Sequence, residues 1–198
     1  MRTTARPRFL PVLAAAIASL TIAAAAHAAA PPAVASTVAP AVTPIAALDV
    51  PRYMGTWYEI AKYPNRFQKA CAGFTSATYR LLPDKTVGVL NRCRRADGTI
   101  DAAAGSARQL GGPDSARLQV RFAPAWLSFL PMVWGDYWVI DLDPDYRLAA
   151  VSDPRREYLW ILARTPTVPR DAYAALLARL AQQGFDLARL QTTPQTGP

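Results

Sequence analysis

The chain has 198 residues, of which 22 are basic and 14 acidic, giving a formal net charge of +8 with a single histidine. The basic residues are scattered and form no stripe interleaved with stacking aromatic residues, which argues against a nucleic-acid-binding protein. With only one histidine, His27, and two cysteines, the composition argues against a zinc site, a serine triad and imidazole acid–base catalysis.

The N-terminus has the pattern of a secretory signal. Three arginines among the first eight residues precede an apolar run over residues 9–26, and small residues end the segment at Ala28. Because the run is rich in alanine and lies at the extreme N-terminus, we interpret residues 1–28 as a cleaved signal peptide and not as a transmembrane anchor. No cysteine lies near Ala28, so a lipoprotein anchor is not expected. The sequence therefore predicts a periplasmic or secreted protein without His27.

Composition divides the remaining chain into three parts. Residues 29–47 are rich in Ala and Pro and carry no charge, which predicts a disordered linker. Residues 48–190 are long enough for one domain with a single sizeable core. Residues 191–198 are predicted to form a disordered tail.

The folded region begins with short β-rich runs at spacings of roughly ten residues, separated by turn signals. The predicted strands cover residues 53–63, 74–82, 86–94, 99–109, 117–122, 136–142, 146–152 and 158–164. Apolar residues then recur at three- and four-residue steps between Pro169 and Gly184, which predicts one amphipathic helix. The simplest architecture is an all-β fold, an eight-stranded antiparallel up-and-down β-barrel with a C-terminal α-helix packed outside.

The two cysteines, Cys71 and Cys93, are an even pair in a chain predicted to be exported. An oxidising compartment favours a disulfide over two free thiols, and the bond requires that the first three strands be neighbours. Closing a loop of this length stabilises a protein by about 3 kcal/mol in the chain-entropy description.

Three separated stretches are similar to motifs of the lipocalin family. They are Gly55-Thr56-Trp57-Tyr58-Glu59-Ile60-Ala61, the turn at residues 141–146, and Leu159-Trp160-Ile161-Leu162-Ala163-Arg164-Thr165-Pro166. The resemblance covers the folded region and is nearest to the group of the bacterial outer-membrane lipocalin, the plant temperature-induced lipocalins and apolipoprotein D. It implies that Arg164 lies across Trp57 beside Gly55 and closes the barrel floor, so these three residues are structural.

The resemblance also implies a ligand-binding barrel, and strand parity indicates which side chains line it. If Trp57 points inward, Glu59 does too, because side chains alternate between the two faces of a strand. Tyr79 and Asn91 match pocket positions of the apolipoprotein D group. The resulting set of predicted ligand contacts is Glu59, Ala77, Tyr79, Leu81, Val89, Asn91, Val120, Phe122, Tyr137 and Trp160, with Val87 on the same face. The alternative is a barrel filled by these side chains.

The function implied by the resemblance is binding and transport of a small hydrophobic ligand, a fatty acid or lysophospholipid, in membrane maintenance or stress. No catalytic residue, metal or cofactor is expected. The rival hypothesis is a lipid-modifying enzyme on the same barrel, with Glu59 or an aspartate as the base. A third hypothesis is a structural protein with a filled barrel.

The region between the fifth and sixth predicted strands contains an apolar stretch at residues 125–134, which is too short to span a bilayer. It is too apolar for an ordinary solvated loop. We interpret the segment from Trp126 to Trp134 as a lid on the barrel, a peripheral membrane contact or a dimer surface. The protein is expected to be a monomer or a weak dimer.

Overall fold

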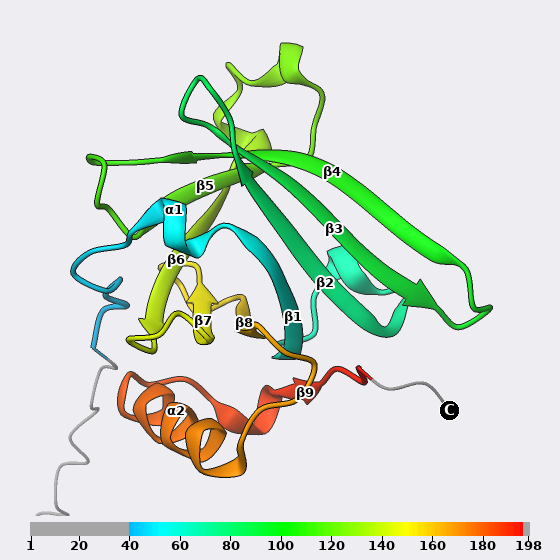
Figure 1. Cartoon of the computed structure of the whole chain (residues 1–198), viewed down its shortest axis with the longest axis vertical. Coiled ribbons are helices and arrows are strands. Elements are labelled where there is room, and N and C mark those ends of the chain that lie inside the picture. Colours follow the sequence, from blue (N-terminus) through cyan, green and yellow to red (C-terminus); the bar gives the residue numbers. More distant parts are fainter. Residues whose placement is uncertain (1–39, 196–198) are drawn as a thin grey trace, which may run out of the picture. The chain divides into compact units, whose positions relative to one another are not determined.

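The computed structural model of the protein describes residues 40–195. Its strands form one antiparallel sheet in which each strand from β2 to β8 pairs with the next. β1 pairs with both β8 and β2 and so closes the sheet into a barrel (Figure 1). The strands are β1 (Gly55–Lys62), β2 (Cys71–Leu81), β3 (Val87–Arg95), β4 (Ile100–Gln109), β5 (Arg117–Arg121), β6 (Gly135–Leu142), β7 (Leu148–Ser152), β8 (Leu159–Ala163) and β9 (Gln191–Thr192).

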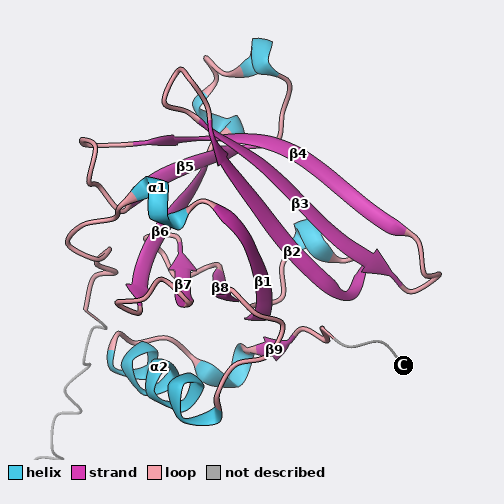
Figure 2. Cartoon of the chain, viewed as in Figure 1, coloured by secondary structure: helices cyan, strands magenta, loops and turns pink. Residues whose placement is uncertain are grey.

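The predicted eight-stranded barrel with one C-terminal helix outside is confirmed, and the helix is α2 (Arg170–Gln182) (Figure 2). Its buried residues Leu176 and Leu180 pack against the outer face of β1, β7 and β8. The guanidinium of Arg179 also forms two hydrogen bonds, of 2.7 and 2.9 Å, to the carboxylate of Asp141 on β6. The helix therefore covers one side of the barrel wall from outside. None of the helices in the described region is long and apolar enough to cross a membrane.

The first strand begins later than predicted, because residues Val50–Tyr53 form the short helix α1. The side chain of Asp49 accepts a hydrogen bond from the backbone N–H of Arg52, and Pro51 lies in the first turn, where its missing N–H needs no partner. Tyr53 was predicted to start a strand and instead lies on this helix.

Antiparallel topology gives the barrel two distinct ends. We call the floor the end that holds α1 and the turns at residues 82–86, 110–116 and 143–147. We call the mouth the opposite end, which holds the loops at residues 63–70, 96–99, 122–134 and 153–158. The predicted disulfide between Cys71 and Cys93 is confirmed, and it joins β2 to β3 at the mouth.

The predicted disordered linker is wrong for residues 40–47, which pack against the barrel. Val42 is buried under α2, and the backbone N–H of Ile45 donates to the carbonyl of Val139 at 2.9 Å. Apolar side chains at these positions bury surface that a free linker would expose to water. The rest of the linker and the signal peptide predicted at residues 1–28 lie outside the described residues.

The predicted disordered tail is also wrong, at residues 191–195. β9 pairs with the end of β1, and the side-chain amide of Gln195 donates to the carbonyls of Glu59 on β1 and Thr75 on β2, at 2.7 and 2.8 Å. The pairing of β1 with β2 ends at Tyr58 and Ser76, so this segment fills the seam where the two strands separate. Backbone groups that would lack partners at this seam are thereby satisfied.

Candidate functional site: the barrel interior

The floor is closed by Arg164. Its guanidinium lies 4.0 Å from the ring centre of Trp57, as the family resemblance implied, and donates hydrogen bonds to the backbone carbonyls of Thr56, Arg52 and Tyr146 at 3.1, 2.8 and 3.1 Å. Burial lowers the pKa of Arg164, because desolvation disfavours its charge. The carbonyl groups and the ring offset that loss, so the cation ties α1, β1 and the β6–β7 turn together.

Gly55 is required at this point of the floor. Its backbone has φ of +95°, which favours glycine, and an added Cβ would lie 3.2 Å from the guanidinium of Arg164. The indole N–H of Trp57 donates to the carbonyl of Tyr53 at 2.8 Å. The first motif thus positions a buried aromatic side chain that has its polar atom satisfied.

Above the floor, most of the predicted contacts do share the inner face. Ala77, Tyr79 and Val89 are buried in the same cluster as Trp57, and Val120, Tyr137 and Trp160 pack against that cluster. Val87 belongs to it as well. The inner wall is therefore lined mostly by apolar and aromatic side chains.

Three of the inner side chains are tyrosines joined by hydrogen bonds. The hydroxyl of Tyr137 lies 3.0 Å from the hydroxyl of Tyr53 and 3.0 Å from that of Tyr79. Burial raises the pKa of all three above the ordinary value for tyrosine, to about 12 for Tyr79, because a phenolate would be poorly solvated inside the barrel. Tyr53 was not predicted to lie inside the barrel, although Asp49 and Pro51 are a helix-start signal that separates it from the first strand.

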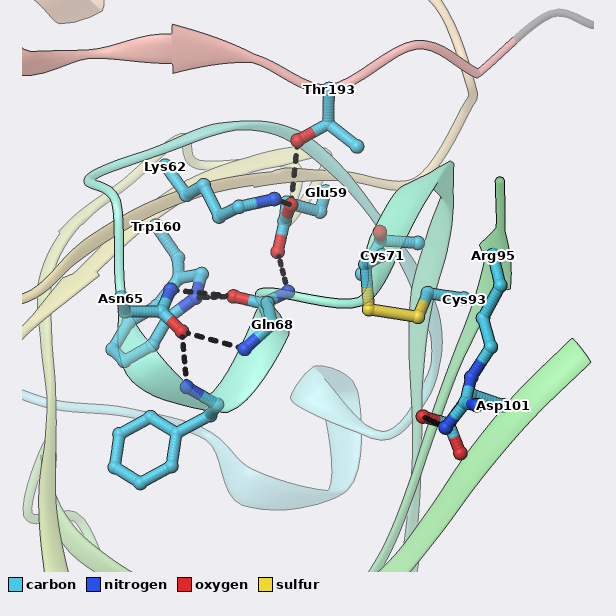
Figure 3. The surroundings of a disulfide bond; sticks show 12 residues. Glu59, Lys62, Asn65, Gln68, Cys71, Cys93, Arg95, Asp101, Trp160 and Thr193 are labelled. Carbon is cyan, nitrogen blue, oxygen red and sulfur yellow. Dashed lines mark hydrogen bonds and ion pairs between the residues drawn. A yellow bond between two sulfur atoms is a disulfide. The ribbon is translucent and has the colours of Figure 1, made fainter. Parts of the chain in front are cut away.

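Glu59 faces inward and is buried, and its carboxylate accepts hydrogen bonds from three side chains of the protein itself. Oε1 accepts hydrogen bonds from Lys62 at 2.8 Å and Thr193 at 2.5 Å, and Oε2 accepts one from Gln68 at 2.5 Å (Figure 3). Lys62 is the last residue of β1, Gln68 belongs to the mouth loop and Thr193 to the C-terminal segment, so three parts of the chain stabilise this buried charge.

Two more predicted contacts, Leu81 and Phe122, lie outside the buried interior. Leu81 is 42% exposed because it is the last residue of β2, at the floor end of the wall. Phe122 is 44% exposed just past β5 at the mouth, where its ring occupies the space beside Gly105, 2.7 Å from the position of an added Cβ. Strand alternation gave the correct face of the sheet for both residues, but it did not show how far along the barrel axis each one lies.

The inner face remains accessible near the mouth. Asn91 is partly buried, and its side-chain oxygen is shielded from solvent without a hydrogen-bond partner among the described residues. Its register partner on β4, Ala103, is exposed although it shares the inner face with Val87, Val89 and Ala107. The barrel therefore combines a sealed aromatic floor with a small-residue wall that solvent reaches from the mouth.

The loop between β5 and β6 is anchored to the outer wall. The ring of Trp134 lies 4.1 Å from the guanidinium of Arg108 on β4 and 5.3 Å from that of Arg121 on β5, both on the outer face. Earlier in the same loop, the side chains of Trp126, Phe129 and Met132 are 72%, 74% and 83% exposed. The loop thus presents uncovered apolar side chains beside the mouth.

Exposed apolar side chains are concentrated at the mouth. Of the seven large hydrophobic residues that are exposed in the described region, only Leu81 lies at the floor end. The six at the mouth are Phe67, Ile100, Phe122, Trp126, Phe129 and Met132. Within residues 40–195 there is no group of three His, Cys, Asp or Glu residues that could hold a metal ion.

Comparisons with known proteins agree with this architecture. A family model described as a lipocalin-like domain matches residues 48–195. Temperature-induced lipocalin-1 from Arabidopsis thaliana is 43% identical over 152 residues, covering 75% of this chain and 80% of that protein. The outer membrane lipoprotein Blc of Escherichia coli K12 is 39% identical over 157 residues, covering 79% and 84%.

More distant similarity extends to animal proteins. Apolipoprotein D from Rattus norvegicus is 31% identical over 153 residues, covering 74% of this chain and 77% of that protein. The solved structure of insecticyanin from the tobacco hornworm Manduca sexta superposes with a TM-score of 0.62 at 17% identity, covering 80% of this chain and 87% of that one. This last similarity concerns the fold alone.

Proposed function

This chain belongs to the lipocalin family, and we propose that it binds and carries a fatty acid or a lysophospholipid in its barrel. The observation that supports this proposal best is the inner face near the mouth, where Ala103 is exposed and the buried side-chain oxygen of Asn91 lacks a partner among the described residues, above an apolar wall. Burying an acyl chain there gains about 25 cal/mol for each Å² of apolar surface removed from water, offset by the lost freedom of the ligand.

We propose that the protein acts outside the cytoplasm in membrane maintenance or stress. The disulfide supports an extracellular or periplasmic location, because such bonds persist in oxidising compartments. The signal-like N-terminus supports the same location. The occupied carboxylate of Glu59 speaks against its use as a catalytic base, which makes the binding function preferable to the rival enzyme.

The proposal that the ligand binds inside the barrel is tested by placing a large side chain on the inner face near the mouth. Ala103→Trp places an indole on the inner face, and we expect it to weaken oleic acid binding about tenfold, because each methylene kept out of the barrel forfeits about 0.8 kcal/mol. The measurement is isothermal titration calorimetry below the micelle concentration of the lipid.

The matched control is Ala104→Trp, one residue along β4. Ala104 is also exposed but faces outward, so the same side chain added there should leave the affinity unchanged. Equal effects of the two substitutions would contradict a ligand site inside the barrel. Native mass spectrometry of protein purified from its own compartment should in addition detect a co-purifying lipid.

We further propose that the β5–β6 loop contacts membranes. Replacing Trp126, Phe129 and Met132 together with serine is expected to weaken binding to vesicles about tenfold or more, because exposed apolar side chains drive interfacial partitioning. Co-sedimentation with liposomes measures the effect. Leu81→Ser, an exposed apolar position at the floor, serves as the control. If the triple variant partitions as strongly as the unmodified protein, this loop is not the contact.

A further inference from the structure

A cavity lies between the β1–β2 loop and the C-terminal segment. Its volume is about 300 Å³. Two of the chain's lysines, Lys62 and Lys69, contribute to its wall, and no acidic side chain does. The other contributing residues are Pro64, Asn65, Gln68, Cys71, Ala72, Gly73, Gln191, Thr192, Thr193 and Pro194. We call this cavity the seam cleft.

The ammonium groups of Lys62 and Lys69 have N–H donors that form no hydrogen bond with the described residues. Lys62 forms one ion pair, at 2.8 Å to Glu59, and its side chain is only 13% exposed. An ammonium group carries three N–H donors, so two of them remain. Lys69 is exposed and forms no ion pair with any described residue. The Glu59 carboxylate offsets the charge of Lys62, so the positive charge that the seam cleft presents to an entering group comes from Lys69.

Gln68 separates the seam cleft from the barrel interior. It contributes to the wall of the cleft, and its side-chain oxygen accepts a hydrogen bond at 3.0 Å from the indole N–H of Trp160 (Figure 3). Trp160 in turn packs against the interior cluster. An acyl chain that joined the two spaces would pass Gln68, which lies in the short 3-10 helix Arg66–Gln68 between β1 and β2.

We propose that the seam cleft binds the anionic head group of the ligand, a carboxylate or a phosphate, while the acyl chain occupies the barrel. This inference rests on the proposed lipid-carrying function. Ammonium donors in a partly enclosed cleft form charge-assisted hydrogen bonds to anionic oxygens, and these are stronger than bonds to neutral oxygens. Lys62 and Lys69 therefore select amphiphiles with an anionic end over neutral ones of the same chain length.

The experiment compares three lipids that share an oleoyl chain: oleic acid, 1-oleoyl-lysophosphatidic acid and 1-monoolein. Lys69→Gln removes one charge from an exposed side chain and leaves the buried Glu59–Lys62 pair intact. We expect this variant to bind the two anionic lipids about fivefold more weakly and monoolein unchanged. Added salt should shrink the difference, because it screens exposed charges.

Lys85→Gln is the matched control, since it removes the same charge at the β2–β3 turn on the floor. It should leave all three affinities unchanged. A loss confined to oleic acid identifies the carboxylate, and a loss confined to the phospholipid identifies the phosphate. If the unmodified protein binds none of the lipids, the carrier proposal fails. If it binds them but Lys69→Gln behaves like Lys85→Gln, only the head-group site is overturned.

Discussion

Replacing Arg164 with alanine is expected to lower the free energy of unfolding by about 3–4 kcal/mol. The substitution removes a cation–π contact worth up to about 2 kcal/mol and charge-assisted hydrogen bonds to three backbone carbonyls. Those carbonyls belong to three different segments, so their loss loosens the floor as a unit. Urea denaturation followed by tryptophan fluorescence measures the change.

Two further variants make this test specific. Arg164→Lys keeps the charge but lacks the planar fork that reaches several acceptors, so it should recover less than half of the loss. Arg170→Ala removes an exposed arginine at the start of α2 and should change stability by less than about 0.5 kcal/mol. A decrease below about 1 kcal/mol for Arg164→Ala would mean that the floor is held by packing alone.

The stability of the protein is expected to fall steeply above pH 10, because of the buried tyrosine cluster. Below pH 10 the hydroxyls of Tyr53, Tyr79 and Tyr137 are protonated in both the folded and the unfolded chain. Above it the unfolded chain releases these protons while the folded chain retains them, since burial raises their pKa, for Tyr79 to about 12. Each such tyrosine lowers the free energy of unfolding by about 1.4 kcal/mol per pH unit.

Denaturation curves between pH 9 and pH 12 measure this slope, which reaches about 4 kcal/mol per pH unit if all three groups contribute fully. The double variant Tyr53→Phe with Tyr79→Phe removes two of the three hydroxyls. It should therefore remove about two thirds of the part of the slope that the three tyrosines contribute. The partly buried Tyr63 and Tyr173 also have raised pKa values and supply a common background. Identical slopes in the two proteins would show that the cluster admits water on ionisation.

The strands and the outer helix could be predicted because their signals are local. Alternation in β1 and β5 and the three- and four-residue steps in α2 follow directly from which face of each element is buried. The errors lie at the ends of the domain. Residues 40–47 and 191–195 have the composition of disordered segments, and they are ordered by contacts with residues far away in sequence, such as Val139 and Glu59.

The candidate site was predictable in part for the same reason. The family resemblance placed Tyr79 on the inner face, and parity then placed Val89 there as well, because alternation is a property of the strand itself. It could not reveal that Leu81 lies level with the floor, since height depends on the tilt and stagger of the closed barrel. Nor could it show that Glu59 meets Thr193, a partner 134 residues later in the chain.

The position of β1 in the sheet has a kinetic consequence. This strand is the first to be synthesised, yet its neighbours include β8 and β9, which belong to the last part of the chain. Contacts between residues so distant in sequence require closure of very long loops, which slows folding to milliseconds or longer. The barrel therefore cannot close before β8 and β9 have been synthesised. Until then its apolar inner face stays exposed to chaperones and to aggregation.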